Sequence, residues 1–226
     1  MARTMGSEPM AMMGLQPWTP AHFAMMFAMW VIMMTGMMLP SATPTALVYA
    51  AVARKASREG TPVAPVAAFV AGYLLMWTLF SLGATVTQWG LERAALLSPM
   101  LVASTPALGG ALLVAAGVYQ LTPLKDVCLE HCRSPAHFIA ERWRPGKLGA
   151  LRMGAEHGAY CLGCCWVLMG LLFFGGVMNL LWIAAIALFV LLEKVVPHGG
   201  GGGRWAGVGM IVAGALVFVG AWRAGG

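Results

Sequence analysis

GAYCLGCCWVLMGLLFFGGVMNLLWIAAIALFVLL, residues 158–192, contains no charged side chain. One helix crosses a membrane with about 20 apolar residues, so this stretch is too long for a single crossing. Two consecutive glycines, Gly175 and Gly176, divide it. We therefore predict a hairpin of two apolar helices, the first ending near Phe174 and the second running from Val177 to Lys194.

The same lack of charge recurs along the chain. Residues 61–91, 94–124 and 205–222 contain no Asp, Glu, Lys or Arg. Of the 226 residues, 60% are hydrophobic and 10% are charged, and the mean hydropathy is +0.78. Such a balance does not suit a surface that faces water on all sides. The sequence therefore predicts an integral membrane protein in contact with the lipid bilayer.

The apolar runs predict an all-α fold, a polytopic transmembrane bundle of about six helices forming one domain over residues 21–223. The first helix spans Ala21 to Leu39 and ends or bends at Pro40, where residues 43–56 are expected to continue it at an angle. Further helices are expected within residues 65–89, 106–121 and 205–222, besides the hairpin.

Polar and glycine-rich segments separate these helices. Residues 1–20 are predicted to be a flexible, Met-rich arm, and Gly199–Gly203 a flexible link. Residues 125–152 are the most polar stretch, and we expect a long loop there, with a short interfacial helix, between the third and fourth membrane helices.

Lysine and arginine are unequally divided between the two sides of the predicted bundle. With the amino terminus outside, the inner segments hold Arg54, Lys55, Arg58, Lys125, Arg133, Arg142, Arg144, Lys147, Arg152, Lys194 and Arg204. The outer segments keep Arg3, Arg93 and Arg223. Because cytoplasmic segments are enriched in Lys and Arg, we predict both termini outside and the polar loop in the cytoplasm. The basic residues form no continuous stripe, so no nucleic-acid partner is predicted.

Cysteine and histidine form two tight groups. In HGAYCLGCC the histidine and three cysteines share one helix face, and CLEHC repeats the same spacing one segment earlier. Thiolates and imidazoles bind Cu(I) and Zn(II). The predicted metal ligands are Cys128, His131, Cys132, His157, Cys161, Cys164 and Cys165. Cysteines also pack as small hydrophobic residues, and this interpretation stays open.

Methionines provide a second candidate site. Twelve of the 18 lie within the first 38 residues. A stripe on the first helix comprises His22, Met25, Met26, Met29, Met33 and Met37, whereas Met34 and Met38 point elsewhere. Of the stripe, we predict Met25, Met29 and Met33 as ligands. Thioethers bind Cu(I) well and Zn(II) poorly, so the stripe favours copper. Filling gaps in a core is the alternative role for these side chains.

A charged pair, Glu193 and Lys194, closes the last helix of the hairpin. A carboxylate inside a membrane is a functional candidate. The alternative is that both side chains, which lie near Pro197 at the end of the helix, extend to the interface between membrane and water. Gln120 and Lys125, at the end of the third helix, are candidates for the same cytoplasmic mouth.

The sequence resembles a family of bacterial predicted metal-binding integral membrane proteins, some of which are called copper chaperones. The matching pieces are MWVIMMTGMMLPSA, YQLTPLKDVCLEHCRSP, HGAYCLGCCWVLM and GVMNLLWIAAIALFVLLEK, within the region from Met25 to Lys194. For a bacterial protein of this kind the predicted membrane is the inner membrane, and the outer side, where the distribution of Lys and Arg places both termini, is the periplasm. The resemblance implies functional roles for Cys128, Cys132, Cys161, Cys164 and Cys165, with Glu193 and Lys194 as part of the pattern.

Three functions are consistent with these features. We favour a non-enzymatic metal-handling protein that binds, delivers or transports Cu(I), with Zn(II) as the alternative ion and a metal-donor or acceptor protein as a partner. The second is a metal-dependent redox enzyme of the membrane, or a subunit of one. The third is a membrane scaffold or assembly factor in which the cysteines are incidental.

Overall fold

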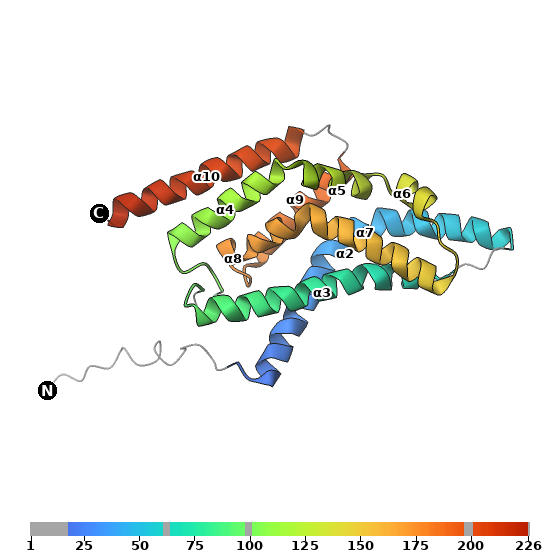
Figure 1. Cartoon of the computed structure of the whole chain (residues 1–226), viewed down its shortest axis with the longest axis horizontal. Coiled ribbons are helices and arrows are strands. Elements are labelled where there is room, and N and C mark those ends of the chain that lie inside the picture. Colours follow the sequence, from blue (N-terminus) through green and yellow to red (C-terminus); the bar gives the residue numbers. More distant parts are fainter. Residues whose placement is uncertain (1–17, 61–63, 98–100, 197–200, 226) are drawn as a thin grey trace.

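The computed structural model describes residues 18–60, 64–97, 101–196 and 201–225, and these form a bundle of helices (Figure 1). The helices are α2 (Pro20–Arg58), α3 (Val66–Arg93), α4 (Pro106–Gln120), α5 (Pro123–Arg133), α6 (Pro135–Arg142), α7 (Gly146–Gly170), α8 (Leu172–Gly175), α9 (Leu180–Val195) and α10 (Gly201–Gly225). Within these ranges the β pairing is limited to an isolated bridge between Leu97 and Ala103. The all-α prediction is confirmed.

Four helical segments are long and apolar enough to cross a membrane: α2, α3, α7 with α8, and α10. Helices α4 and α5 would make a fifth span together, although they are bent by 66° relative to each other. Helix α9 has 16 residues and is therefore about 24 Å long, less than the roughly 30 Å hydrocarbon core of a bilayer. The described residues thus support four or five spans, and a count of six stays a prediction.

Helix α2 continues through Pro40 and Pro44 as a helix of 39 residues. Each internal proline lacks the N–H that would bond the carbonyl four residues earlier. Figure 1 shows that α2 changes direction partway along its length, as expected for a helix with two internal prolines. The predicted bend is therefore present, but the helix does not end at Leu39.

The polar segment 125–152 differs most from the sequence prediction, because it is helical and not a long loop. It contains most of α5, all of α6 and the first turns of α7. Thr122 caps α5 by accepting a hydrogen bond from the backbone N–H of Lys125, and Pro123 occupies the first turn. Proline is also favoured at that position, since a first-turn residue needs no helical N–H bond. These local signals start a helix despite the polarity of the segment.

The break predicted at Gly175 and Gly176 is present. Helix α8 ends at Gly175, and Gly176 has a φ of 93°, a conformation that glycine adopts without strain. Asn179 then caps α9 by accepting a hydrogen bond of 3.2 Å from the N–H of Trp182. The second helix of the hairpin therefore begins at Leu180 and not at Val177.

The predicted glycine link begins outside the described residues, because 197–200 are not among them, but its last part does not form a link. Gly201–Gly203 are the first residues of α10. The predicted Met-rich arm lies almost entirely in residues 1–17, outside the described residues.

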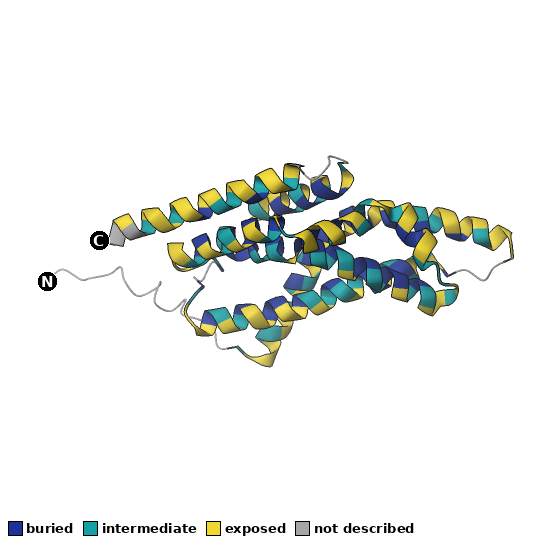
Figure 2. Cartoon of the chain, turned by 45° about the horizontal axis from the view of Figure 1, so that its top comes forward, coloured by how far each residue is buried: buried dark blue, intermediate teal, exposed yellow. Residues whose placement is uncertain are grey.

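Helix α7 forms the centre of the bundle and packs along α3 and α5, while α10 packs along α4. In Figure 2 the buried residues follow the inner faces of the helices, whereas α10 is exposed along most of its length. Backbones of α3 and α7 meet closely at two glycines: a Cβ at Gly72 would collide with the backbone of Leu151, and a Cβ at Gly154 with that of Phe69. These glycines allow α7 to lie directly against α3.

Replacing Gly154 with alanine should lower the free energy of unfolding by about 1–3 kcal/mol, because the helices must move apart. The matched control is Gly83→Ala on α3, where no atom lies within 4 Å of the added Cβ. That change should be neutral or stabilising by up to about 1 kcal/mol. Thermal unfolding in detergent measures both, and equal midpoints for the two variants would contradict the close contact.

Candidate functional site

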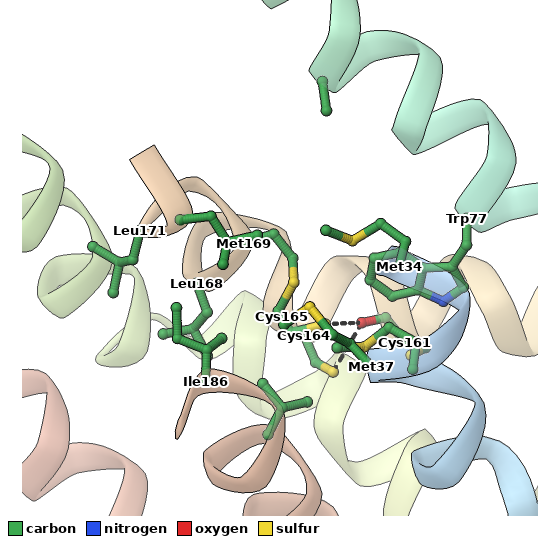
Figure 3. Packing of buried hydrophobic residues seen from close by; sticks show 14 of the residues in the cluster. Met34, Met37, Trp77, Cys161, Cys164, Cys165, Leu168, Met169, Leu171 and Ile186 are labelled. Carbon is green, nitrogen blue, oxygen red and sulfur yellow. Dashed lines mark hydrogen bonds between the residues drawn. The ribbon is translucent and has the colours of Figure 1, made fainter. Parts of the chain in front are cut away.

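Three cysteines of α7 lie in the interior of the bundle. Cys161, Cys164 and Cys165 are each exposed by 2% or less. Their spacing of three and four residues places them on the face of α7 that is turned toward the core, as the sequence predicted. Figure 3 shows their sulfur atoms close together, with Met34 and Met37 of α2 beside them.

The second cysteine group meets the first through α5. Cys132 is also buried, and it belongs to the same packed core as Cys161, Cys164 and Cys165. Cys132, Cys161, Cys164 and Cys165 are therefore one group, called here the thiol cluster. All of them are free cysteines.

Cys128 lies at the edge of the thiol cluster. It is half-buried, and its sulfur approaches Gly163, where a Cβ would lie 2.7 Å from it. It packs against the core that contains the other four cysteines. The structure thus brings both cysteine groups to one place, which their sequence spacing did not require.

The thiols of the cluster are engaged with the backbone of α7. Cys164 and Cys165 donate hydrogen bonds of 3.0 and 2.9 Å to the carbonyl oxygen of Cys161, drawn as dashed lines in Figure 3. In the part of the chain that the structure describes, no three His, Cys, Asp or Glu side chains are arranged to hold one metal ion. The sulfurs are gathered but not yet directed at a common point.

A polar group adjoins the cluster at Cys161. The Nζ of Lys194 lies 2.9 Å from the sulfur of Cys161 and 3.0 Å from the hydroxyl oxygen of Ser41. The hydroxyl of Tyr73 lies 3.0 Å from the same sulfur and donates to the carbonyl of Met38. Cys161 is thus in contact with polar groups of α3 and α9, and Lys194 of α9 in turn contacts Ser41 of α2.

A buried ion pair ties α5 to α9. Lys125 Nζ lies 2.6 and 2.7 Å from the two carboxylate oxygens of Glu193, and Gln120 bonds to both partners. Arg133 adds a hydrogen bond of 2.7 Å from its Nε to the backbone carbonyl of Glu193. Lys125 is 1% and Glu193 9% exposed. Lys125 and Glu193 are therefore both buried, and their charges are paired within the bundle.

The two predicted histidine ligands lie beside the cluster. The buried His157 ring packs among aromatic rings, with centroids 5.3 Å from Phe138 and 5.8 Å from Tyr73. Its Nδ1 has no hydrogen-bond partner among the described residues. His131 stacks on Tyr160 with the centroids 4.1 Å apart, and its Nδ1 bonds the carbonyl of Val127.

The methionines that lie at the cluster are not the three predicted as ligands, although one of them, Met37, belongs to the predicted stripe. Met25 is 56% exposed. Met29 and Met33 are half-buried and line a groove of about 610 Å³ between α2 and α9, together with Met37 and Met178. The groove forms only where α2 and α9 pack together, so a helical-wheel projection of α2 alone could not predict it.

Met34, in contrast, is fully buried and lies next to the cysteines with Met37 and Met169 (Figure 3). The sequence predicted that Met34 and Met38 point away from the methionine stripe. In the structure both side chains are fully buried in the core. Their face also carries Trp30, Ser41 and Thr45. The polar residues Ser41 and Thr45, at helical spacing from Met34 in an apolar helix, are the signal in the sequence that could have identified this face as buried.

These observations define a class of protein: an all-helical bundle, with helices long and apolar enough to cross a membrane, built around a buried group of thiols. A family model described as a copper chaperone, PpoB2, matches residues 27–217. The chain belongs to this family, and the resemblance found in its sequence is confirmed. Searches of curated proteins and of solved structures gave no match.

Removing one partner of the buried pair should be costly, because the other charge stays inside the bundle. Glu193→Leu should lower the free energy of unfolding by about 3–5 kcal/mol. The double variant Lys125→Met/Glu193→Leu should recover part of this loss, since neither charge remains.

The control is the exposed pair of Arg204 and Asp126, 3.5 Å apart, where Asp126→Asn should change stability by no more than about 1 kcal/mol. Thermal unfolding of the purified variants is the measurement. If the double variant were less stable than Glu193→Leu, an unpaired buried charge could not be the cause of the lost stability.

Proposed function

We propose that this protein binds Cu(I) within the membrane at the thiol cluster and hands it to a partner protein. The observation that carries the proposal is the meeting of four buried thiols from α5 and α7 in a member of a copper chaperone family. Independent packing choices on two separate helices would not be expected to bring four thiols together.

The chemistry of these side chains favours a soft ion. Thiolates and thioethers select Cu(I), whereas oxygen ligands select hard cations. Cys164 and Cys165 would have to turn from the Cys161 carbonyl toward the ion, a rotation about a single bond in each side chain. Met34 and Met37 are the thioethers placed to complete such a site (Figure 3). Zn(II) is the less suitable ion, because thioethers bind it poorly.

The methionine groove suggests how the ion arrives. Met25 is exposed near the start of α2, Met29 and Met33 follow along the groove, and Met37 both lines the groove and lies at the cluster. We place the start of this route on the periplasmic side of the inner membrane, with both chain termini. Cys128, His131 and His157 are then ligands at the margin of the cluster that take part in loading or release.

The ends of the bundle support this orientation. The carboxyl end of α2, the amino end of α3 and α6 lie at one end of the molecule, opposite the carboxyl ends of α3 and α10 (Figure 1). The basic residues Arg54, Lys55, Arg58 and Arg142 belong to the first end. A cytoplasmic location for that end agrees with the excess of Lys and Arg on cytoplasmic segments.

Anaerobic titration with Cu(I) tests the proposal. Wild-type protein in detergent should bind Cu(I) in competition with a chromogenic chelator. The triple variant Cys161→Ser/Cys164→Ser/Cys165→Ser should bind none above background, because hydroxyls are poor ligands for a soft ion. Cys132→Ser should keep binding with an affinity lowered by about 10- to 100-fold, as expected for the loss of one contributor.

The control is Met25→Leu, which should leave the affinity at the cluster unchanged because Met25 lies on the surface. Equal copper content in the wild type and the triple variant would overturn the proposal and favour a scaffold with incidental cysteines. A copper signal that changes with dioxygen or a quinone would instead favour the redox enzyme.

A further inference from the structure

Lys194 places an ammonium group inside the bundle at the thiol cluster. The side chain is 8% exposed. Its Nζ has two hydrogen-bond partners, the sulfur of Cys161 at 2.9 Å and the hydroxyl of Ser41 at 3.0 Å. These contacts come from α7 and α2, so the position of the ammonium is fixed by three helices.

The charge of Lys194 is not balanced by a carboxylate. The neighbouring Glu193 turns to the other side of α9 and binds Lys125. Among the described residues, no carboxylate oxygen lies within 4.0 Å of Lys194 Nζ, since the ion pairs found there involve other residues. Ser41 and Tyr73 are neutral donors or acceptors. A buried cation of this kind is costly unless an anion accompanies it.

The sulfur atoms are the groups that can supply this negative charge. Cys161 is in direct contact with the ammonium, and Cys164 and Cys165 are both hydrogen-bonded to the backbone carbonyl of Cys161. We propose that Lys194 is the fixed counter-cation of the metal–thiolate complex and thereby sets the net charge of that complex to −1. This inference rests on the proposed function. It adds the number of thiolates that bind the copper ion in the loaded site.

The charge balance then limits the ligands. One Cu(I) with two thiolates has a net charge of −1, which Lys194 neutralises. A third thiolate would leave one uncompensated negative charge in the low-dielectric interior. Any further ligand must therefore be neutral, and the thioethers of Met34 and Met37 meet this requirement. The mixture of cysteine and methionine around α7 is explained by this limit (Figure 3).

Measuring the binding of two metal ions of different charge distinguishes an effect of the Lys194 charge from an effect of its side-chain shape. Hg(II) also prefers two thiolates, but its complex with them is neutral and needs no counter-cation. Lys194→Gln should lower the affinity for Cu(I) by about 10- to 100-fold, the usual effect of losing a partner of the ligand shell. The same variant should bind Hg(II) at least as well as the wild type, in competition with dithiothreitol. Lys194→Arg should restore most of the Cu(I) affinity.

Lys147→Gln is the matched control, because Lys147 is exposed at the start of α7. Loss of both ions in Lys194→Gln would show a structural defect and overturn the inference, as would unchanged Cu(I) affinity. X-ray absorption of the copper-loaded wild type gives a second measurement that needs no variant. Two short copper–thiolate bonds are expected, and three equal ones would overturn the inference. Wild-type protein that binds no Cu(I) would instead reject the proposed function itself.

Discussion

The carboxyl end of α9 carries two opposite charges into the interior of the bundle, and the arrangement around it follows from their need for partners. Glu193 binds Lys125 of α5, and Lys194 contacts Cys161 of α7 and Ser41 of α2. In a medium of low dielectric constant, a charge without a partner is far more costly than in water. Each contact therefore restricts where α2, α5 and α7 lie relative to α9.

This restriction has a consequence for the sulfur atoms. Holding α5 through Lys125 also holds Cys132, two turns further along the same helix face, against the cysteines of α7. Close contact of α3 and α7 at Gly72 and Gly154 fixes α7 on its other side. The ion pair of Lys125 with Glu193 and the glycine contacts of α3 with α7 thus hold the thiols together without involving sulfur, and the contact of Lys194 with the Cys161 sulfur adds to them. Such a scaffold keeps the thiols near one another without a bound ion, which is consistent with the proposed role of accepting and releasing Cu(I).

The thioethers divide into two groups by environment. Those of the groove, Met29 and Met33, lie at the surface of the core, while Met34 lies inside it. A soft ligand in an exposed groove exchanges its ion readily, whereas ligands excluded from water hold it longer. Neutral sulfur also adds coordination without adding charge, which matters next to a single compensating ammonium.

Local properties of the chain are what the sequence alone determined. The length of the apolar runs, the break at Gly175 and Gly176 and the shared face of Cys161, Cys164 and Cys165 are all present. Each depends on residues within a few turns of one another, so spacing and composition predict them. The polar segment 125–152 was misjudged because its capping residue and prolines outweighed its polarity.

Only the tertiary structure decided which separate elements meet. It joined Cys132 to the α7 cysteines, placed Met34 in the core and not Met25, and gave Glu193 and Lys194 different partners. These outcomes depend on how helices far apart in the sequence pack and rotate, and a helical period does not contain that information. The physical reason is that burial and charge pairing are properties of the assembled bundle, whereas periodicity belongs to each helix by itself.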